Sequence, residues 1–425
     1  MLTGSSWMAI AVFIIAYTII VSEKIHRTKV ALIGAVALLL LKVMPQEEAI
    51  AKVDFNTIGL LLGMMIVVAI AMRTGMFEYM AIKLAKRVHG DPRKVMSIFF
   101  AFTAITSAFL DNVTTVLLVT PIIFSITATL KLNPVPFLIS EIFASNIGGT
   151  ATLIGDPPNI MIGGAVGLSF NDFLFALAPV VVVIGLVTNW LFLYIYRKQL
   201  VVEPQAQQLI MELDEHAYLK DVKLLKKVVL VLGLIVLGFI LHNTLHIESA
   251  TIAMAGAAVL LLISGLDPEE LFKELEWTTI FFFVGLFILV GGLEVTGVIR
   301  SIAEWGLSIT DSNLVLLGIL ILWLSAIASA FIDNIPFVAT MIPLIKSMAQ
   351  VGNLDVSTLW WSLALGACLG GNGTVIGASA NVIVSSIASA KGHSISFVGF
   401  MKIAFPLMLV SIVIAHVYLY FRYFI

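Results

Sequence analysis

Two aspartate–asparagine pairs lie near the middle of long apolar segments, where a charged side chain is costly unless it has a function. The pairs are Asp111-Asn112, within residues 97–130, and Asp333-Asn334, within residues 314–349. Carboxylates and amides at membrane depth can bind a coupling ion, carry a proton or cap a helix. Both segments exceed the ~20 residues of one span, so each predicts a re-entrant hairpin with the polar pair at its tip.

Two glycine-rich stretches interrupt two further apolar segments. GGTATLIGDPPN (148–159) lies within 136–168, and GGNGTVIGASAN (370–381) lies within 358–388. Glycine lets a helix break without a Cβ clash, Pro157 suits a first helical turn, and Asp156 before it is a natural N-cap. Each stretch therefore predicts an interrupted helix, whose free N–H groups attract anions and whose free carbonyls coordinate cations.

The two halves of the chain repeat each other at one constant offset, so that position 107 corresponds to 329 and position 148 to 370. SAFLDNVTTVLLVTPII (107–123) and SAFIDNIPFVATMIPLI (329–345) agree at about half of their positions, and so do the two glycine-rich stretches. An odd number of five spans per repeat means that the second copy inserts upside down. Two inverted halves can exchange roles across a membrane, which is the geometric basis of alternating access in transporters.

The elements that must position these groups are membrane helices. Of 425 residues, 60% are hydrophobic and only 12% are charged, which indicates a chain solvated by lipid. Apolar segments are found at residues 7–22, 28–44, 56–72, 97–130, 136–168, 173–195, 228–242, 250–265, 278–295, 314–349, 358–388 and 399–421. We predict an all-α polytopic protein of the cell (inner) membrane, built from two inverted repeats. Each repeat has five spans and one hairpin, giving about ten spans and two hairpins.

Charge sets the predicted domain boundaries and orientation. Residues 1–196 form the first repeat, 197–227 a polar linker, and 228–425 the second repeat. With the N-terminus outside, 19 of the 24 Lys and Arg residues lie in inner loops, as the positive-inside rule requires. The linker is then cytoplasmic, the hairpin 97–130 is inner and 314–349 is outer. Residues 7–21 have no basic segment before them, which favours a retained helix over a signal peptide.

Several function classes are excluded by composition. Cys368 is the single cysteine, so an internal disulfide and a cysteine-rich metal site are impossible, and a net charge of −2 gives no basic surface for nucleic acid. No catalytic nucleophile–base pair, nucleotide-binding motif or redox motif is found, so neither enzymatic activity nor a cofactor is expected. Transport must then be driven by an ion gradient or by a separate ATPase subunit.

The acidic residues leave alternatives open. Asp111 and Asp333 can bind ions or cap the second hairpin helices, and Asp156 can act as a cap, a proton or ion site, or both. At the repeat offset Asp156 corresponds to Ala378 and Glu141 corresponds to Leu363. This asymmetry favours a specific task for Asp156, whereas Glu141 can couple protons or lie near the interface. His242 and His246 have metal-compatible spacing but no third ligand, which favours capping at the interface.

At these motifs the chain resembles the ion-transporter superfamily, specifically ArsB/NhaD-type permeases, and most of all the P-protein branch. The resemblance implies a scaffold, a mobile transport unit with elevator-like movement, a homodimer, and substrate and ion binding at the hairpin tips and interrupted helices. It does not extend to the Ser-Asn-Thr tips of related dicarboxylate carriers. The implied binding residues are Asp111, Asn112, Thr114, Thr115, Asn146, Thr150, Thr152, Asp156, Asn159, Asp333, Asn334, Asn372, Thr374, Ser379 and Asn381.

Three transported substrates fit this pattern. Efflux of arsenite or antimonite coupled to proton entry is the first, because a neutral trihydroxide suits Asn, Thr and backbone N–H groups and the expected site holds no Lys or Arg. Na⁺/H⁺ antiport is the second, because Asp111, Asp156 and Asp333 could bind sodium and protons in competition. Anion or carboxylate transport is the third. A channel gains nothing from inverted symmetry and is disfavoured.

Overall fold

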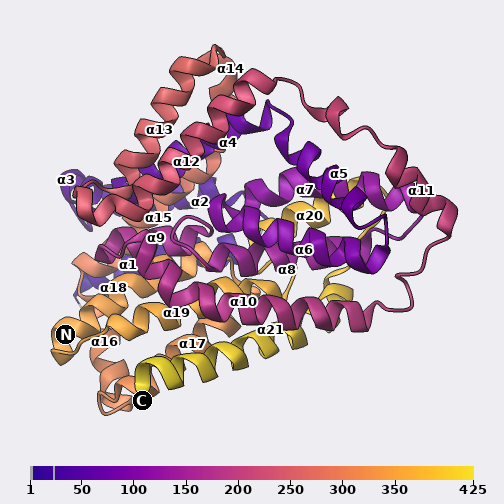
Figure 1. Ribbon diagram of the computed structural model, residues 1–425. Coiled ribbons are helices and arrows are strands. Elements are labelled where there is room, and N and C mark those ends of the chain that lie inside the picture. The colour runs from indigo at the N-terminus through magenta and orange to yellow at the C-terminus, as the bar shows by residue number, and fades with distance from the viewer. Residues whose placement is uncertain (1–2, 23) are drawn as a thin grey trace.

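The computed structural model describes residues 3–22 and 24–425, and all regular elements in this part of the chain are helices (Figure 1). Nine of the described helices are long and apolar enough to cross a bilayer. The predicted fold class, an all-α polytopic membrane protein, is confirmed. Helices α2 and α13, both predicted as spans, have 14 and 16 residues; at 1.5 Å per residue they reach only about 21 and 24 Å.

The helices of the first half precede a short linker. They are α1 (Gly4–Ser22), α2 (Arg27–Leu40), α3 (Gln46–Ala51), α4 (Phe55–Met72), α5 (Met76–Arg87), α6 (Pro92–Phe109), α7 (Asn112–Thr129), α8 (Val135–Thr150), α9 (Pro157–Val166) and α10 (Phe170–Ile195). The linker holds α11 (Pro204–Glu212) and the 3₁₀ turn η1 (Glu215–Tyr218).

The second half repeats this order. Its helices are α12 (Val222–Leu245), α13 (Ser249–Ser264), α14 (Pro268–Phe272), α15 (Trp277–Val295), α16 (Val298–Ile309), α17 (Leu314–Phe331), α18 (Asn334–Gly352), α19 (Ser357–Gly370), η2 (Gly371–Gly373), α20 (Ser379–Ala390), α21 (Phe397–Leu419) and a terminal π turn η3 (Tyr420–Phe424). Apart from the turn η2, each helix from α13 to α20 begins at the repeat offset from the corresponding helix between α2 and α9. The repeat found in the sequence is therefore also a repeat of the helical structure.

The equivalent helices α4 and α15 run in opposite directions. Lys52, just before α4, pairs with Glu294 at the end of α15 at 3.0 Å. Arg73, just after α4, pairs with Glu274, just before α15. The start of each helix therefore lies beside the end of the other, which is the antiparallel arrangement that inverted repeats require.

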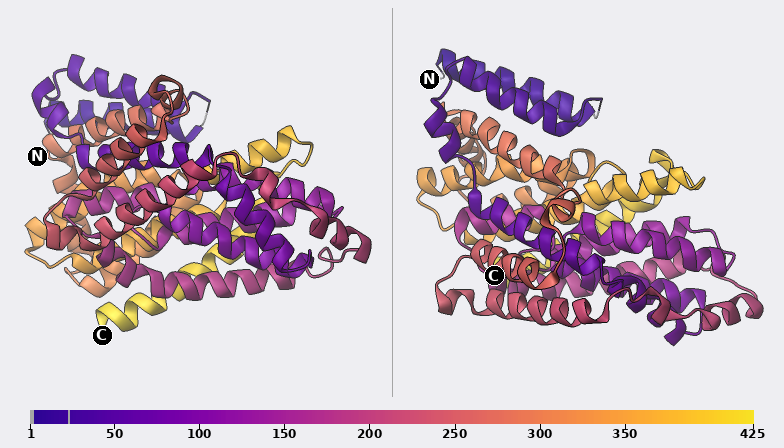
Figure 2. Two further views of the ribbon diagram at one scale, coloured as in Figure 1. Left: turned by 45° about the horizontal axis from the view of Figure 1, so that its top comes forward. Right: turned by 90° about the horizontal axis from the view of Figure 1, so that it is seen from above.

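One group of helices, α1–α4 with α12–α15, packs through close backbone contacts and is called the framework here. A Cβ on Gly63 of α4 would lie 2.7 Å from the backbone of Ala253 in α13, and one on Gly285 of α15 would lie 2.7 Å from that of Ala31 in α2. Small residues permit such approach where lipid gives no hydrophobic drive for association. Seen from above, α1 and α2 lie along one edge of the molecule and α12 and α13 along the opposite edge (Figure 2).

A second group, α6–α10 with α17–α21, is called the core. Its hairpins α6–α7 and α17–α18 turn at the predicted tips, and each packs on an interrupted helix. The hydroxyl of Ser107 donates to Ser145 O at 2.7 Å, and the equivalent Ser329 donates to Ala367 O at 2.6 Å. Helices α10 and α21 lie side by side (Figure 1), joined by a hydrogen bond from the Tyr418 hydroxyl to Ala176 O.

Two features differ from the predicted elements. Helices α5 and α16 were not predicted, because they mix charged and apolar residues and are only 12 residues long. Helix α12 begins at Val222, inside the range 197–227 predicted for the linker. The linker also contacts the first repeat, since Lys86 Nζ lies 2.5 Å from Glu215 and the backbone N–H of Lys220 donates to Thr74 O at 3.0 Å.

Candidate functional site

The two interrupted helices are held open by equivalent asparagines. Asn159 Nδ2 donates to Thr150 O at 3.1 Å and to Thr152 O at 2.9 Å. Asn381 Nδ2 donates to Gly371 O at 2.7 Å and to Thr374 O at 2.8 Å. Carbonyls that a continuous helix would pair internally are thus satisfied by side chains, which lets irregular backbone exist at membrane depth.

Glycines bring each hairpin against its interrupted helix. A Cβ on Gly148 would lie 2.1 Å from Ala104 O of α6, and one on Gly370 would lie 2.5 Å from Ala326 O of α17. No side chain fits at either position without moving the backbone. The close contact fixes each hairpin tip beside the break in the helix it packs on.

Asp156 lies where the two hairpin tips meet. It is fully buried, and its carboxylate accepts from Asn112 Nδ2 at 3.4 Å and from Asn334 Nδ2 at 3.3 Å. Pro157 occupies the first turn of α9 as predicted, but the Asp156 side chain makes no capping hydrogen bond there. The prediction of a natural N-cap is therefore wrong for the carboxylate, which is bound by one amide from each hairpin instead.

A chain of buried amides continues from Asp156 into the second repeat. Asn146 accepts from Asn112 Nδ2 at 3.1 Å and donates to Asn372 Oδ1 at 3.0 Å and Asn381 Oδ1 at 2.9 Å. Asn372 Nδ2 is buried and has no hydrogen-bond partner among the described residues. Asn372 is fully enclosed, so an oxygen-bearing ligand would bind this donor only after the surrounding segments separate.

The tip aspartates cap the second helix of each hairpin. Asp111 accepts from the backbone and hydroxyl of Thr114 at 2.8 and 2.5 Å, and Asp333 accepts from the backbone N–H of Ile335 at 3.0 Å. Asp333 Oδ2 also accepts from the hydroxyl of Ser379 at 2.8 Å. Capping uses Oδ1 of Asp333 and leaves its Oδ2 to Ser379, whereas Thr114 binds both carboxylate oxygens of Asp111. The two roles considered from the sequence are therefore compatible at Asp333.

The predicted threonines bind backbone rather than one another. Thr150 donates to Asn146 O at 2.7 Å, Thr374 donates to Ala330 O at 2.5 Å, and Thr152 donates to Ala108 O. The buried hydroxyl of Thr115 has no partner among the described residues. Thr152 and Thr374 thus join breaks to hairpins, whereas Thr150 bonds within α8. None of the three lines the cavity between the tips.

Two charged residues of the site were missed from sequence. Arg27, at the start of α2, donates to Asp333 Oδ2 at 2.6 Å and to Ser379 Oγ at 2.9 Å. Glu276, just before α15, lines the same cavity between the tips. The expectation of a site without Lys or Arg is therefore wrong. Arg27 was predicted to lie in an inner loop, and no local sequence pattern indicates its contact with the distant Asp333. Glu276 could have been found from the repeat, because the equivalent residue Asp54 is also acidic.

The cavity between the tips is small and acidic. Its volume is about 20 Å³, close to the space that one water molecule needs. Its charged lining residues are Arg27, Asp111, Asp156 and Glu276, and the other polar ones are Asn112, Thr279, Asn334 and Ser379. Together with Asp333, which is bound to Arg27, the tip site holds four carboxylates and one guanidinium, so ionised carboxylates there favour small cations over anions.

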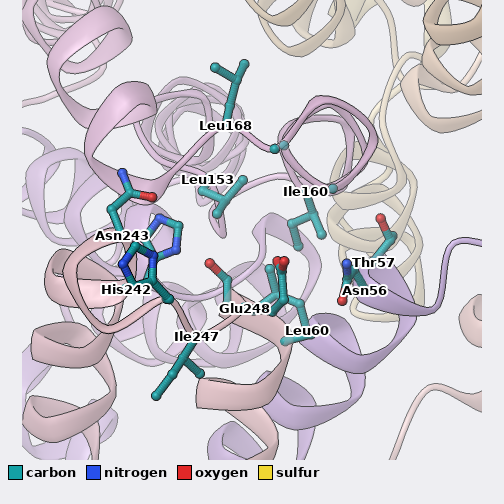
Figure 3. A pocket seen from close by; sticks show the side chains of 16 residues that line it. Asn56, Thr57, Leu60, Leu153, Ile160, Leu168, His242, Asn243, Ile247 and Glu248 are labelled. Carbon is teal, nitrogen blue, oxygen red and sulfur yellow. The ribbon is translucent and has the colours of Figure 1, made fainter.

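A different cavity, shown in Figure 3, lies between α4, α9, α12 and α13 and has a volume of about 340 Å³. His242, Asn243 and Glu248 line one side of it, opposite Asn56 and Thr57. It shares no lining residue with the cavity between the tips. In the described part of the chain no three His, Cys, Asp or Glu side chains gather as a metal site would require.

Relatives named as membrane proteins or transporters match this sequence over nearly its full length. An uncharacterized transporter of Mycobacterium tuberculosis is 43% identical over 99% of both chains, and a 46 kDa membrane protein of Mycobacterium leprae is 42% identical over 98% of this chain and 99% of its own. The P protein of Mus musculus is 34% identical and matches 97% of this chain, which spans 59% of that protein. The predicted resemblance to the P protein is confirmed, whereas the ArsB/NhaD-type assignment stays a prediction.

The fold also matches a solved transporter. The YdaH transporter of Alcanivorax borkumensis superposes with a TM-score of 0.59 over 98% of both chains at 13% identity, a likeness of fold alone. The family model described as a citrate transporter, CitMHS, matches residues 17–366. With its inverted helical repeats and its named relatives, the chain belongs to the CitMHS family of multi-pass secondary transporters.

Proposed function

We propose that this protein is a cation-coupled secondary transporter of the Na⁺/H⁺ exchange type, with Asp156 as the group that carries the cation. The observation that supports this most is the buried carboxylate of Asp156, which receives one amide from each hairpin tip. A buried carboxylate whose charge is neutralised by either a proton or a sodium ion can exchange one for the other.

The size and lining of the cavity favour a small cation. A volume of about 20 Å³ accommodates one bare ion or one water and no polyatomic solute. Asn112 and Asn334 present their Nδ2 groups to Asp156. Rotation of either amide by half a turn would replace the donor by Oδ1, so the same side chains can serve the free carboxylate and a bound sodium ion.

Movement of the core against the framework would give access from both sides. Arg73, Glu78 and Lys220 line a cavity of about 470 Å³ that also contains Glu276 of the tip site. At the opposite end of α4, Lys52 and Glu294 line a cavity of about 460 Å³ between framework and core. In the predicted orientation the first faces the cytoplasm, so this conformation is inward-facing and a shift of the core would turn the site outward.

Arsenite or antimonite efflux coupled to proton entry is the second candidate. The unpartnered Nδ2 of Asn372 favours it, because this buried donor suits a neutral hydroxide oxygen. The cavity would have to widen to admit the trihydroxide. Carboxylate transport, which the name of the family model suggests, is less favoured because the tip site holds four carboxylates and a single guanidinium.

Proteoliposomes with an imposed pH gradient test these candidates in parallel. We expect sodium to collapse the gradient in the wild type and to leave it intact with Asp156→Asn, which keeps the size of the side chain and removes its charge. Gradient-driven arsenite accumulation without sodium movement would establish the second candidate. Citrate uptake alone, or unchanged sodium exchange in Asp156→Asn, would refute cation exchange at Asp156.

A further inference from the structure

Arg27 contacts the tip of the second hairpin from outside the core. Its Nη1 lies 2.6 Å from Asp333 Oδ2 and 2.9 Å from Ser379 Oγ, and these two groups also bind each other. The guanidinium carbon lies 4.9 Å from the ring centre of the buried Phe282 in α15. The guanidinium is therefore held by a carboxylate, a hydroxyl and an aromatic face.

This ion pair joins the two groups of helices. Arg27 and Phe282 belong to the framework, whereas Asp333 and Ser379 belong to the core. Any shift of the core along the framework must separate the guanidinium from the carboxylate. Separation would leave a partly desolvated carboxylate uncompensated unless another cation replaces the guanidinium.

The second symmetric position has no such pair. At the repeat offset Arg27 corresponds to Ser249, and Asp333 corresponds to Asp111. Asp111 accepts hydrogen bonds from Thr114 and has no ion-pair partner in the described part of the chain. The framework therefore supplies a cation to one hairpin tip only, which makes the two conformations of an alternating transporter energetically unequal.

Dissolved ions can reach this pair. A cavity of about 270 Å³ is lined by His26, Arg27, Asp333 and Ser379, and the side chains of Arg27 and Asp333 remain 27% and 15% exposed. Asp111, Asp156 and Glu276 line the adjoining cavity between the tips. The carboxylate of Asp333 and the hydroxyl of Ser379, which bind the guanidinium here, are also oxygen ligands of the kind that hard cations take.

We propose that Arg27 is a tethered competitor for a cation at Asp333, beside the tip cavity in which Asp156 carries the exchanged ion. Without a cation it binds Asp333 and locks the core to the framework; a cation bound to Asp333 releases it and permits the core to move. This inference rests on the proposed cation coupling and assigns Arg27 as a positioning residue that makes movement depend on the ion.

Sodium titration of exchange in proteoliposomes tests the competition. Arg27→Ser copies the equivalent Ser249. It should lower the half-saturating sodium concentration by about tenfold, because sodium then binds Asp333 without first displacing the Arg27 guanidinium. Arg27→Lys keeps a tethered charge and should stay near the wild type. Lys29→Ser is the control, because it removes an exposed positive charge from the same helix and so measures the effect of net charge alone on sodium affinity.

A second measurement follows the conformation itself. Val21 of α1 and Ile383 of α20 both line the cavity beside Arg27, so a bifunctional maleimide should join cysteines placed there in a Cys368→Ala background. Sodium should slow this reaction in the protein with Arg27. With Arg27→Ser the reaction should be slow with or without sodium, and an unaltered elution profile and melting temperature would establish that the variant folds.

The outcomes separate the two proposals. If the wild type responds to neither sodium nor pH, the proposed cation coupling fails. If the wild type exchanges sodium and Arg27→Ser has the same or a higher half-saturating sodium concentration, the proposed cation coupling is kept and the proposed competition by Arg27 is refuted. A lower concentration with lost sodium dependence of cross-linking supports it, because a merely structural arginine would not improve ion affinity on removal.

Discussion

The two interrupted helices share one backbone design and differ in their chemistry. Both breaks are held open by an asparagine, and both pack through a glycine on a hairpin. Yet Asn146 and Asp156 of the first repeat correspond to Cys368 and Ala378 of the second. The shared backbone design and the symmetric hairpin amides therefore build the site, whereas Asp156, which has no acidic counterpart in the second repeat, is the group that the proposed exchange depends on.

Removing the Asp156 carboxylate should have the largest effect on transport. Asp156→Ala, which copies Ala378, should reduce exchange by about 100-fold, the equivalent of about 2–3 kcal/mol for lost hydrogen bonds to a charged group. The measurement is dequenching of a pH-sensitive dye in proteoliposomes. Adding Ala378→Asp to this variant should not restore exchange; restoration would mean that the two halves are chemically interchangeable.

The packing glycines should respond alike in both halves. Gly148→Ala and Gly370→Ala would place a methyl group 2.1 and 2.5 Å from a carbonyl oxygen, and overpacking of this kind typically costs about 1–3 kcal/mol. We expect both variants to melt at a lower temperature in detergent, Gly148→Ala more so. Gly233→Ala is the matched control, because a Cβ there meets nothing within 4 Å. Loss of stability in only one half would argue against equal packing roles.

The amide chain should show an intermediate, one-sided effect. Asn146→Ala leaves the oxygens of Asn372 and Asn381 unpaired, so we expect about a tenfold weaker apparent affinity for the cation, from roughly 1.4 kcal/mol. The equivalent change, Cys368→Ala, removes a weak contact to Asn159 and a thiol hydrogen bond to Asp156, and it should weaken affinity less than Asn146→Ala does. Titration of exchange against cation concentration measures both, and equal effects would contradict the one-sided assignment.

The linker contact should give the smallest effect. It binds α5 of the first repeat, and the Lys86 hydrogen bond lowers the pKa of Glu215 from its ordinary 4.5. The contact therefore adds stability above that value and loses it as pH falls through the lowered pKa. At neutral pH, Glu215→Gln should speed proteolysis of the linker by only about twofold, as expected for exposed ion pairs.

Glu212→Gln is the matched control for this experiment, since Glu212 is exposed and in no ion pair of the described residues. Proteolysis that accelerates equally in both variants would show that charge alone matters. Unchanged exchange in Glu215→Gln would place the linker outside the transport cycle.

Much of the fold could be predicted because the two repeats share identical residues at a constant offset. Identities at one offset located both hairpins and both breaks, and the helix starts at 92 and 314 or at 135 and 357 follow the same offset. Helices α5 and α16 were not predicted, because their mixture of charged and apolar residues is typical of neither a membrane span nor a loop. Helix α12 begins within the range predicted for the linker because Lys223, Lys226 and Lys227 lie in its first turns, where charged residues resemble a loop.

The candidate site was predictable in its residues and less so in their partners. The polar tips and glycine-rich breaks identify Asp111, Asp156 and Asp333 by composition alone. Their partners depend on contacts between distant segments, such as Arg27 with Asp333, which no local pattern encodes. The cap expected for Asp156 failed for the same reason, since amides from two other segments compete for its carboxylate.

The backbone contacts of Gly63 with Ala253 and of Gly285 with Ala31 have a consequence for how the chain tolerates change. Each crossing is the symmetric copy of the other, so the same steric limit applies at both places and a side chain is excluded from both. Equivalent framework positions of the two repeats should therefore both reject larger side chains, whereas equivalent positions at the proposed ion site need not respond alike.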